Sequence, residues 1–224
     1  MSYIMRNEDY GYGITFIDID ETLFHTTAKV LVLKNHKVIK KLTNKEFNIY
    51  VLNDGETFDF SEFTDSKLFY ETSKPITSII NQLKDIIEGI KKDESGSKII
   101  LLTARRDLEN KDLFLQTFRD QGIDIDNKKI IYIERAGNIV GMSIAQKKKM
   151  IITKYLEQGI FRRCRLIDDS KENLREFLKL SIELSPIIKS AVRKHYDVSE
   201  DDELIHFYAS LVLPDGSLEV ISHV

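Results

Sequence analysis

Two aspartates stand two residues apart at the end of an apolar run. The run extends from Ile14 to Ile19 and is typical of a buried strand, and Asp18 and Asp20 lie at its end. Side chains alternate along a strand, so residues i and i+2 point to the same side. Two carboxylates so close repel each other, and burying either one is costly. The spacing therefore predicts a positive charge between the two aspartates, or a proton on one of them.

Polar side chains also end three later apolar runs. They are Thr103, Arg105 and Arg106 after the second run, Glu134 and Arg135 after the third, and Asp168, Asp169 and Ser170 after the fourth. Ligands of a doubly wound sheet bind beyond the carboxyl ends of its strands, so these groups are expected to meet at one edge. Clustered carboxylates bind a hard divalent cation, usually Mg²⁺ where phosphate is also bound. The sequence thus predicts a Mg²⁺ ion between the first two aspartates, where it removes their repulsion.

A bound phosphate also needs a nearby cation, and the segment "AQKKKM" offers three lysines. With about 100° per residue in a helix, the inward stripe of this segment consists of Ile144, Ile151, Ile152 and Tyr155. Lys148 falls in the middle of that stripe, Lys147 at its edge and Lys149 well outside it. A lysine within an apolar stripe needs a carboxylate or phosphate partner. Lys148 is therefore the preferred active-site lysine, with Lys147 as the alternate.

The elements that must position these residues alternate between strands and helices. Strands are expected at 14–19, 98–102, 129–133 and 163–167, and helices at 75–92, 110–122, 143–159 and 170–180. Pro75 is expected to open the first helix, and Ser170 to cap the last one. Continuous apolar strands that alternate with helices predict an α/β fold, a doubly wound, Rossmann-like and mostly parallel sheet.

Residues 24–74 interrupt this alternation. Phe47, Ile49 and Val51 alternate on one face of an expected strand, and Asp54-Gly55 is a strong hairpin turn. The segment begins just after the two aspartates, so it is expected to form a flap over their site. The predicted organisation is an α/β core of residues 1–23 and 75–224 with a small β-rich cap insertion at 24–74.

The C-terminal part is expected to contain a helix, an acidic loop and a hairpin. The stretch "SPIIKSAVRKHYDVSEDDE" suits the helix and the loop, and "LIHFYASLVLPDGSLEVISHV" suits the hairpin. Pro214-Asp215-Gly216 provides the turn. The hairpin either extends the sheet or packs on its edge.

Composition narrows the class of protein. The length of 224 residues suits one domain with a large insertion, and a hydrophobic share of 42% argues against disorder. The net charge of -3 gives no broad nucleic-acid footprint. A single cysteine, Cys164, excludes an internal disulfide framework and fits a reducing cytoplasm. Without a secretory signal or a membrane-length apolar run, the expected location is cytoplasmic.

The motifs together carry a resemblance to a known family. "DIDETLF", "LLTAR", a lysine on a helix and "LIDDS" occur in the order of the four motifs of the haloacid dehalogenase (HAD) superfamily, which the chain resembles over residues 13–180. The insertion resembles a β-type cap in its position. The pattern "DETLFHTTAKV…FDFSEF…ETSKPI" also resembles uncharacterised phosphatase-like members from tailed bacteriophages. The resemblance implies a HAD-like phosphatase, a phosphoric monoester hydrolase that forms an aspartyl-phosphate.

The resemblance also implies roles for individual residues. Asp18 would be the nucleophile. Asp20 would be the general acid for the leaving oxygen and then the base for water. Thr103 would hydrogen-bond a phosphoryl oxygen, and Lys148 would neutralise the developing charge and steady Asp18. Arg105 joins Thr103 and Lys148 as a candidate substrate-binding residue, although Arg105 and its neighbour Arg106 are otherwise expected at the surface.

The same resemblance implies Mg²⁺ as the cofactor. Its ligands would be Asp18, the backbone carbonyl of Asp20, and Asp168, with Asp169 beside them as a further ligand or a neighbour of the ligands. Glu21 departs from the family pattern, because many members have glycine at this position.

Other functions compete with a phosphatase. Dehalogenation needs no proton donor at Asp20, and a signalling receiver domain has its paired acids early in the chain, whereas here Asp168 and Asp169 come last. A catalytically idle binding module and a phosphotransferase acting on a small metabolite remain as alternatives. The substrate is expected to be a phosphorylated compound, with nucleotides or a polynucleotide end favoured by a small flap that leaves the site open. No membrane and no obligate protein partner are expected.

Overall fold

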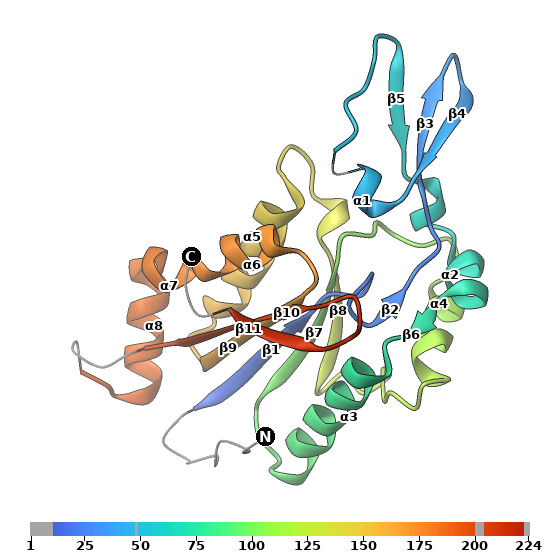
Figure 1. The fold of residues 1–224 in the computed structure, drawn as a ribbon. Coiled ribbons are helices and arrows are strands. Elements are labelled where there is room, and N and C mark those ends of the chain that lie inside the picture. The colour runs from blue at the N-terminus through green and yellow to red at the C-terminus, as the bar shows by residue number, and fades with distance from the viewer. Residues whose placement is uncertain (1–10, 48, 200–203, 222–224) are drawn as a thin grey trace.

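The computed structural model describes residues 11–47, 49–199 and 204–221. Within them, a central six-stranded sheet has the strand order β11-β10-β9-β1-β7-β8 (Figure 1). The strands are β1 (Tyr12–Ile17), β7 (Lys98–Thr103), β8 (Ile131–Arg135), β9 (Phe161–Asp168), β10 (His206–Val212) and β11 (Leu218–Ile221). Neighbouring strands are parallel except β11, which is antiparallel to β10. The prediction of an α/β fold with a mostly parallel sheet is confirmed.

Helices cover both faces of this sheet. Those on one face are α3 (Thr77–Lys92) and α4 (Lys111–Arg119), and those on the other are α5 (Ile144–Leu156), α6 (Lys171–Leu178), α7 (Leu180–Glu183) and α8 (Pro186–Tyr196). The two layers are visible on opposite sides of the strands in Figure 1. Ile17 of β1 packs with the first layer and Phe16 with the second. The central strands β1 and β7 are largely apolar because both of their faces are covered.

The C-terminal hairpin extends the sheet. β10 pairs in parallel with β9, and the chain returns as β11 through a turn that includes Pro214-Asp215-Gly216. This settles the alternative between extension and edge packing. The acidic residues at 200–203 lie outside the described residues.

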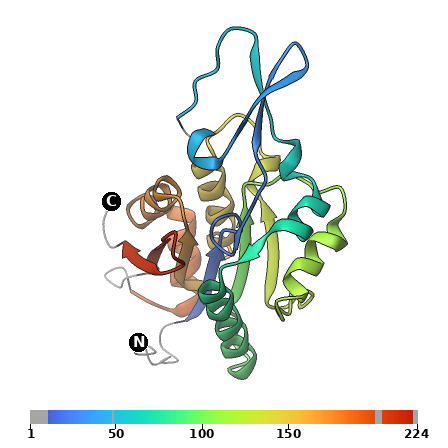
Figure 2. The same ribbon diagram turned by 45° about the vertical axis from the view of Figure 1, so that its right-hand side comes forward.

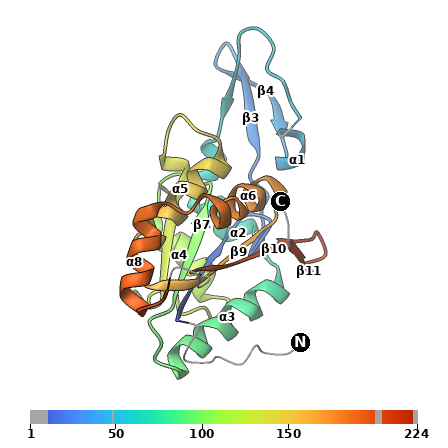
Figure 3. The ribbon, with the colours of Figure 1, turned by 90° about the vertical axis from the view of Figure 1, so that its left-hand side faces the viewer.

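The inserted segment leaves and rejoins the core at one place. β2 (Phe24–His25) pairs antiparallel with β6 (Lys74–Pro75), at the predicted boundaries of the insertion. Pro75 therefore lies in a short strand, and α3 begins two residues later than expected, at Thr77. Between β2 and β6, a separate sheet has the order β4-β3-β5, with β3 at Val30–Lys34, β4 at Lys37–Leu42 and β5 at Glu56–Asp59. Figures 2 and 3 show this small sheet projecting from the rest of the molecule.

The predicted strand around Phe47, Ile49 and Val51 is wrong. Phe47 ends the short helix α1 (Asn44–Phe47), and Ile49 and Val51 are each 83% exposed in non-strand segments. The turn at Asp54-Gly55 leads into β5, which pairs with β3 rather than with the residues before the turn. Alternating apolar residues failed as a signal because this small sheet has too little core to bury them all.

The second half of the insertion is helical and packs into the core. It comprises a 3₁₀ turn, η2 (Ser61–Phe63), and α2 (Ser66–Thr72). Phe69 of α2 is 1% exposed and contacts Phe24, Phe114 and Phe118. Burial of this aromatic ring fixes one end of the insertion to α4.

Candidate functional site

Asp18, Lys148 and Asp168 meet at the carboxyl edge of the sheet. Asp18 directly follows β1, and Asp168 ends the neighbouring strand β9. Lys148 of α5 donates hydrogen bonds to Asp18 Oδ1 at 2.5 Å and to Asp168 Oδ2 at 2.7 Å. All three side chains are buried. The lysine thus links two acids that come from adjacent strands.

The start of α5 sets which of the three lysines enters the site. Ser143 caps this helix, and its side chain and that of Gln146 form a reciprocal capping box. Lys148 then points to the sheet, while Lys149 pairs with Glu183 and Glu176 on another side of the helix. The structure therefore places Lys148 at the aspartates, as the helical stripe predicted.

Asp168 is held from several directions. Its Oδ1 accepts hydrogen bonds from the backbone N–H of Ser170 at 2.9 Å and from Asn173 Nδ2 at 2.8 Å. Ser170 also caps α6, as predicted, through the backbone N–H of Asn173. With both oxygens engaged, Asp168 orients Lys148. Sequence reasoning missed the role of Asn173, although its position three residues after the cap was a usable signal.

The protonation of this cluster follows from burial and from the excess of acids. Burial raises the pKa of Asp18 well above its usual range, and the Lys148 charge opposes that rise. Burial acts against the charge on Lys148 too, but the carboxylates of Asp168 and Asp18 outweigh it and raise the lysine pKa. Lys148 therefore stays protonated, and Asp18 and Asp168 share its positive charge.

A metal-binding cluster includes Asp169. Oxygen atoms of Asp18, Asp168 and Asp169 all lie within 4.8 Å of one another. With all three carboxylates ionised, they would face one ammonium group and leave two negative charges unbalanced. An all-oxygen donor set with this excess fits a hard divalent cation. The cluster can hold a metal ion.

Asp169 has the most accessible carboxylate of this cluster. Its side chain is exposed, yet the surrounding protein partly desolvates its carboxylate group. This desolvation, and next the charge of Asp168, raise its pKa to about 7. A cation that bound there would displace a proton over a physiological pH range.

Asp20 is paired with a cation of its own. Arg105 Nε lies 2.9 Å from Asp20 Oδ2, and Arg105 Nη2 lies 2.6 Å from Asp20 Oδ1. The Asp20 carboxylate is outside the metal-binding cluster. Each of these two carboxylates thus has a cationic partner, Lys148 for Asp18 and Arg105 for Asp20, and the expectation that one metal ion separates them stays a prediction. The metal role expected of the Asp20 backbone carbonyl stays a prediction.

Arg105 also differs from its predicted place. Its side chain is 1% exposed, so it is not a surface residue, whereas its neighbour Arg106 is exposed. The nitrogens Nε, Nη1 and Nη2 all donate to protein acceptors. With its donors directed to the protein, Arg105 is poorly placed for the predicted contact with substrate.

Thr103 ends β7 beside these groups. It is fully buried, and its Oγ1 accepts a hydrogen bond from the backbone N–H of Arg105 at 3.0 Å. This contact links the end of the strand to the loop that follows it. The structure thus places Thr103, as predicted, at the same sheet edge as the aspartates.

Glu21 and His25 form a further pair at this edge. Glu21 has a φ of 59°, a left-handed conformation that favours the glycine expected at this position. Its carboxylate accepts hydrogen bonds from the backbone N–H of Thr26 at 3.0 Å and lies 2.9 Å from His25 Nδ1. These contacts hold a glutamate where its backbone is strained.

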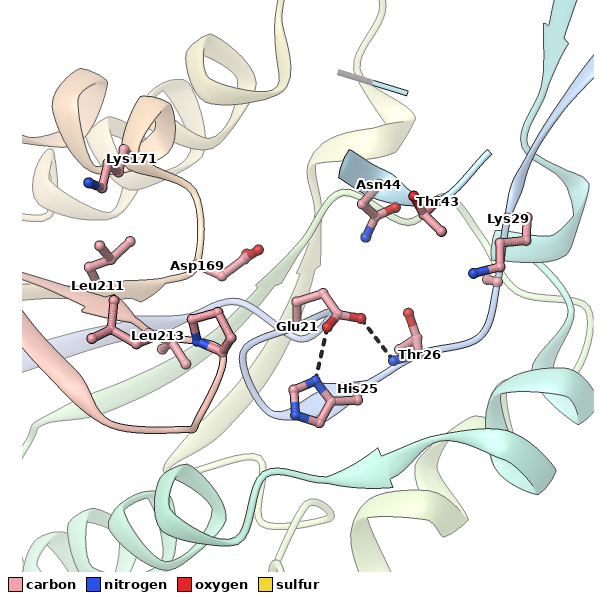
Figure 4. A pocket seen from close by; sticks show the side chains of 13 residues that line it. Glu21, His25, Thr26, Lys29, Thr43, Asn44, Asp169, Lys171, Leu211 and Leu213 are labelled. Atoms are coloured by element: carbon pink, nitrogen blue, oxygen red, sulfur yellow. Dashed lines mark hydrogen bonds and ion pairs between the residues drawn. The ribbon is translucent and has the colours of Figure 1, made fainter. Parts of the chain in front are cut away.

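A pocket of about 490 Å³ lies between these residues and the base of the insertion. Its lining comprises Glu21, His25, Thr26, Ala28, Lys29, Thr43, Asn44, Asp169, Lys171, Leu211, Val212, Leu213 and Pro214. Figure 4 shows the Lys29 amine and the Asn44 amide turned toward the space beside Glu21. The pocket therefore joins Asp169 to a wall of polar groups from the insertion and an apolar wall from the C-terminal hairpin.

Comparison with known proteins adds no assignment to this geometry. No protein-family model, no curated protein and no solved structure matches the chain. Among the described residues, every helix is too short or too polar to cross a membrane.

Proposed function

We propose that this protein is a Mg²⁺-dependent phosphomonoester hydrolase of the HAD type that works through an aspartyl-phosphate on Asp18. The observation that carries the proposal is the convergence of Asp18, Lys148, Asp168 and Asp169 on one sheet edge. Phosphoryl transfer asks mainly for positioning and for positive charge against the phosphoryl oxygens. This edge supplies a held carboxylate, a buried ammonium group and a cluster suited to a divalent cation.

Asp18 and Asp20 take part in both halves of the proposed reaction. In the first half, an Asp18 oxygen bonds to phosphorus while the ester P–O bond breaks, and Asp20 gives a proton to the leaving oxygen. In the second half, water attacks phosphorus, the bond to Asp18 breaks, and Asp20 takes the proton from water. That proton is the one Asp20 delivers in the next turnover.

The other residues supply charge and orientation. Lys148 holds one Asp18 oxygen in place and faces the negative charge that builds up on the transferring group. Thr103 offers a hydroxyl at the same edge. A divalent cation held by Asp18, Asp168 and Asp169 would add positive charge against the phosphoryl oxygens.

The proposal is tested by hydrolysis of p-nitrophenyl phosphate with Mg²⁺ and with EDTA. We expect turnover that depends on Mg²⁺ and that falls to background in Asp18→Asn. Turnover that survives in Asp18→Asn would refute the proposal. A wild-type protein that hydrolyses neither this ester nor a panel of nucleoside monophosphates, sugar phosphates, phosphopeptides and 3′-phosphorylated oligonucleotides would favour the idle binding module instead.

A further inference from the structure

Arg105 is a buried charge that the proposed reaction does not itself use. It is among the largest fully buried side chains of the described residues. Burial of a charged group is costly unless it is paired and hydrogen-bonded. The free-energy cost of burying this charge indicates that the Arg105 side chain has partners in the protein that it holds in place.

The guanidinium group of Arg105 binds Asp20 in a fork. Nε and Nη2 reach the two carboxylate oxygens at 2.9 and 2.6 Å, while Nη1 donates to the backbone carbonyl of Phe63 at 2.9 Å. A forked arginine–carboxylate pair fixes orientation as well as charge. Asp20 can therefore hardly rotate without breaking two hydrogen bonds.

The insertion completes this arrangement from the other side. The guanidinium carbon lies 4.5 Å from the ring centre of Phe69 and 5.3 Å from that of Phe63. Such contacts favour a cation over an aromatic face, more so when water is absent. Phe63 and Phe69 belong to η2 and α2. The helical half of the insertion thus places Arg105, and Arg105 places Asp20.

We propose that Arg105 is a positioning residue for the proton transfers of Asp20, and that the insertion acts on those transfers through it. The fork keeps the Asp20 carboxylate aimed while water is activated. It keeps the same carboxyl group aimed when the proton is passed to the leaving oxygen. This inference rests on the proposed function, because it assigns Arg105 to one step of that reaction.

Leaving groups of different basicity separate this role from a merely structural one. The p-nitrophenolate ion leaves without a proton, whereas the alkoxide of benzyl phosphate needs one. General acid catalysis contributes about 10²–10⁴-fold, so we expect Arg105→Ala to lower kcat/KM for benzyl phosphate about 10²-fold more than for p-nitrophenyl phosphate. Asp20→Asn should give the same selective loss, and the double variant should be no worse than Asp20→Asn alone.

Two further variants keep the test decisive. Arg105→Lys keeps a positive charge but loses the fork, so it should show a smaller selective loss, and it is the deciding variant where Arg105→Ala fails to fold. Arg106→Ala removes the exposed neighbouring arginine and should leave both substrates unaffected. Equal losses on the two substrates, or additive losses in the double variant, would overturn the positioning role. A wild-type protein inactive on both esters and on the panel of phosphorylated compounds named above would instead remove the proposed function itself.

Discussion

At the scale of single residues, the site consists of four acids and two cations. Lys148 bridges Asp18 and Asp168, and Arg105 holds Asp20. Asp169 completes, with Asp18 and Asp168, the cluster that can hold a metal ion. The pairing of these acids with their cations therefore affects both the stability of the fold and the chemistry at this edge of the sheet.

Removal of the Lys148 ammonium group leaves two buried carboxylates without their cation. Loss of one partner from a buried ion pair costs about 3–5 kcal/mol, so Lys148→Met should lower the free energy of unfolding by an amount in that range and abolish phosphatase turnover. Lys147→Ala is the matched control on the same helix and should change neither by much. Denaturant unfolding and an ester assay measure the two effects, and full activity in Lys148→Met would contradict the account.

The acid excess makes the metal-free protein sensitive to pH. Because the pKa values of Asp18 and Asp169 are raised on folding, the folded state binds more protons than the unfolded one, and stability falls as pH rises from about 4 to about 7. We expect the Tm in EDTA to be lower at pH 7.5 than at pH 5, and Mg²⁺ to restore more of it at pH 7.5. A metal-free Tm that increases over this range would contradict this assignment.

The sequence predicted the residues of this site better than their partners. Alternation along a strand and the stripe of a helix placed Asp18, Asp20 and Lys148 at one edge, because these periodicities depend only on local geometry. The pairing of Asp20 with Arg105 was not predicted, because it depends on an insertion whose packing no local pattern encodes. The burial of Arg105 follows from the same cause.

At the scale of elements, the loop after β7 packs closely against the short turn that follows β8. Gly137 lies in the short 3₁₀ turn η3 (Ala136–Asn138) that follows β8. A Cβ atom there would lie 2.2 Å from the carbonyl oxygen of Ala104 and 2.8 Å from the carbonyl carbon of Arg105. The absent side chain at Gly137 thus lets the loop that carries Arg105 approach the sheet edge.

Gly137→Ala should displace this loop. We expect lower stability, together with a loss of turnover that is larger for benzyl phosphate than for p-nitrophenyl phosphate, because Asp20 loses its partner. Gly13→Ala is the matched control, since its nearest contact would be an ordinary 3.6 Å from Ser97 Oγ. Thermal unfolding and the two esters decide the matter, and a Gly137→Ala protein with wild-type kinetics on both would count against it.

At the scale of the whole molecule, the insertion has two parts with different attachments. The projecting sheet of β3, β4 and β5 has a small core of its own, whereas α2 shares the main core through Phe69. The β-rich character expected from the sequence therefore describes only the first part. Aromatic residues such as Phe69 and Phe114 are far apart in the chain, so their contact appears only in the folded structure.

Phe69→Ala should loosen the insertion from the core. Truncation of a buried phenylalanine costs about 3–5 kcal/mol, and the exposed neighbour Tyr70→Ala should cost less than about 1 kcal/mol. Chemical denaturation gives both values. Similar costs for the two variants would show that α2 is not held by this aromatic cluster.

The most direct measurement of the central claim is to trap the phosphoryl group on the protein. Wild-type protein is mixed with p-nitrophenyl phosphate and Mg²⁺, quenched in acid, and treated with borohydride, which reduces an acyl phosphate to an alcohol. Peptide mass spectrometry should then find the reduced residue at Asp18, and an Asp18→Asn protein should show none. Turnover accompanied by a label on another residue, or by no label at all, would contradict the account.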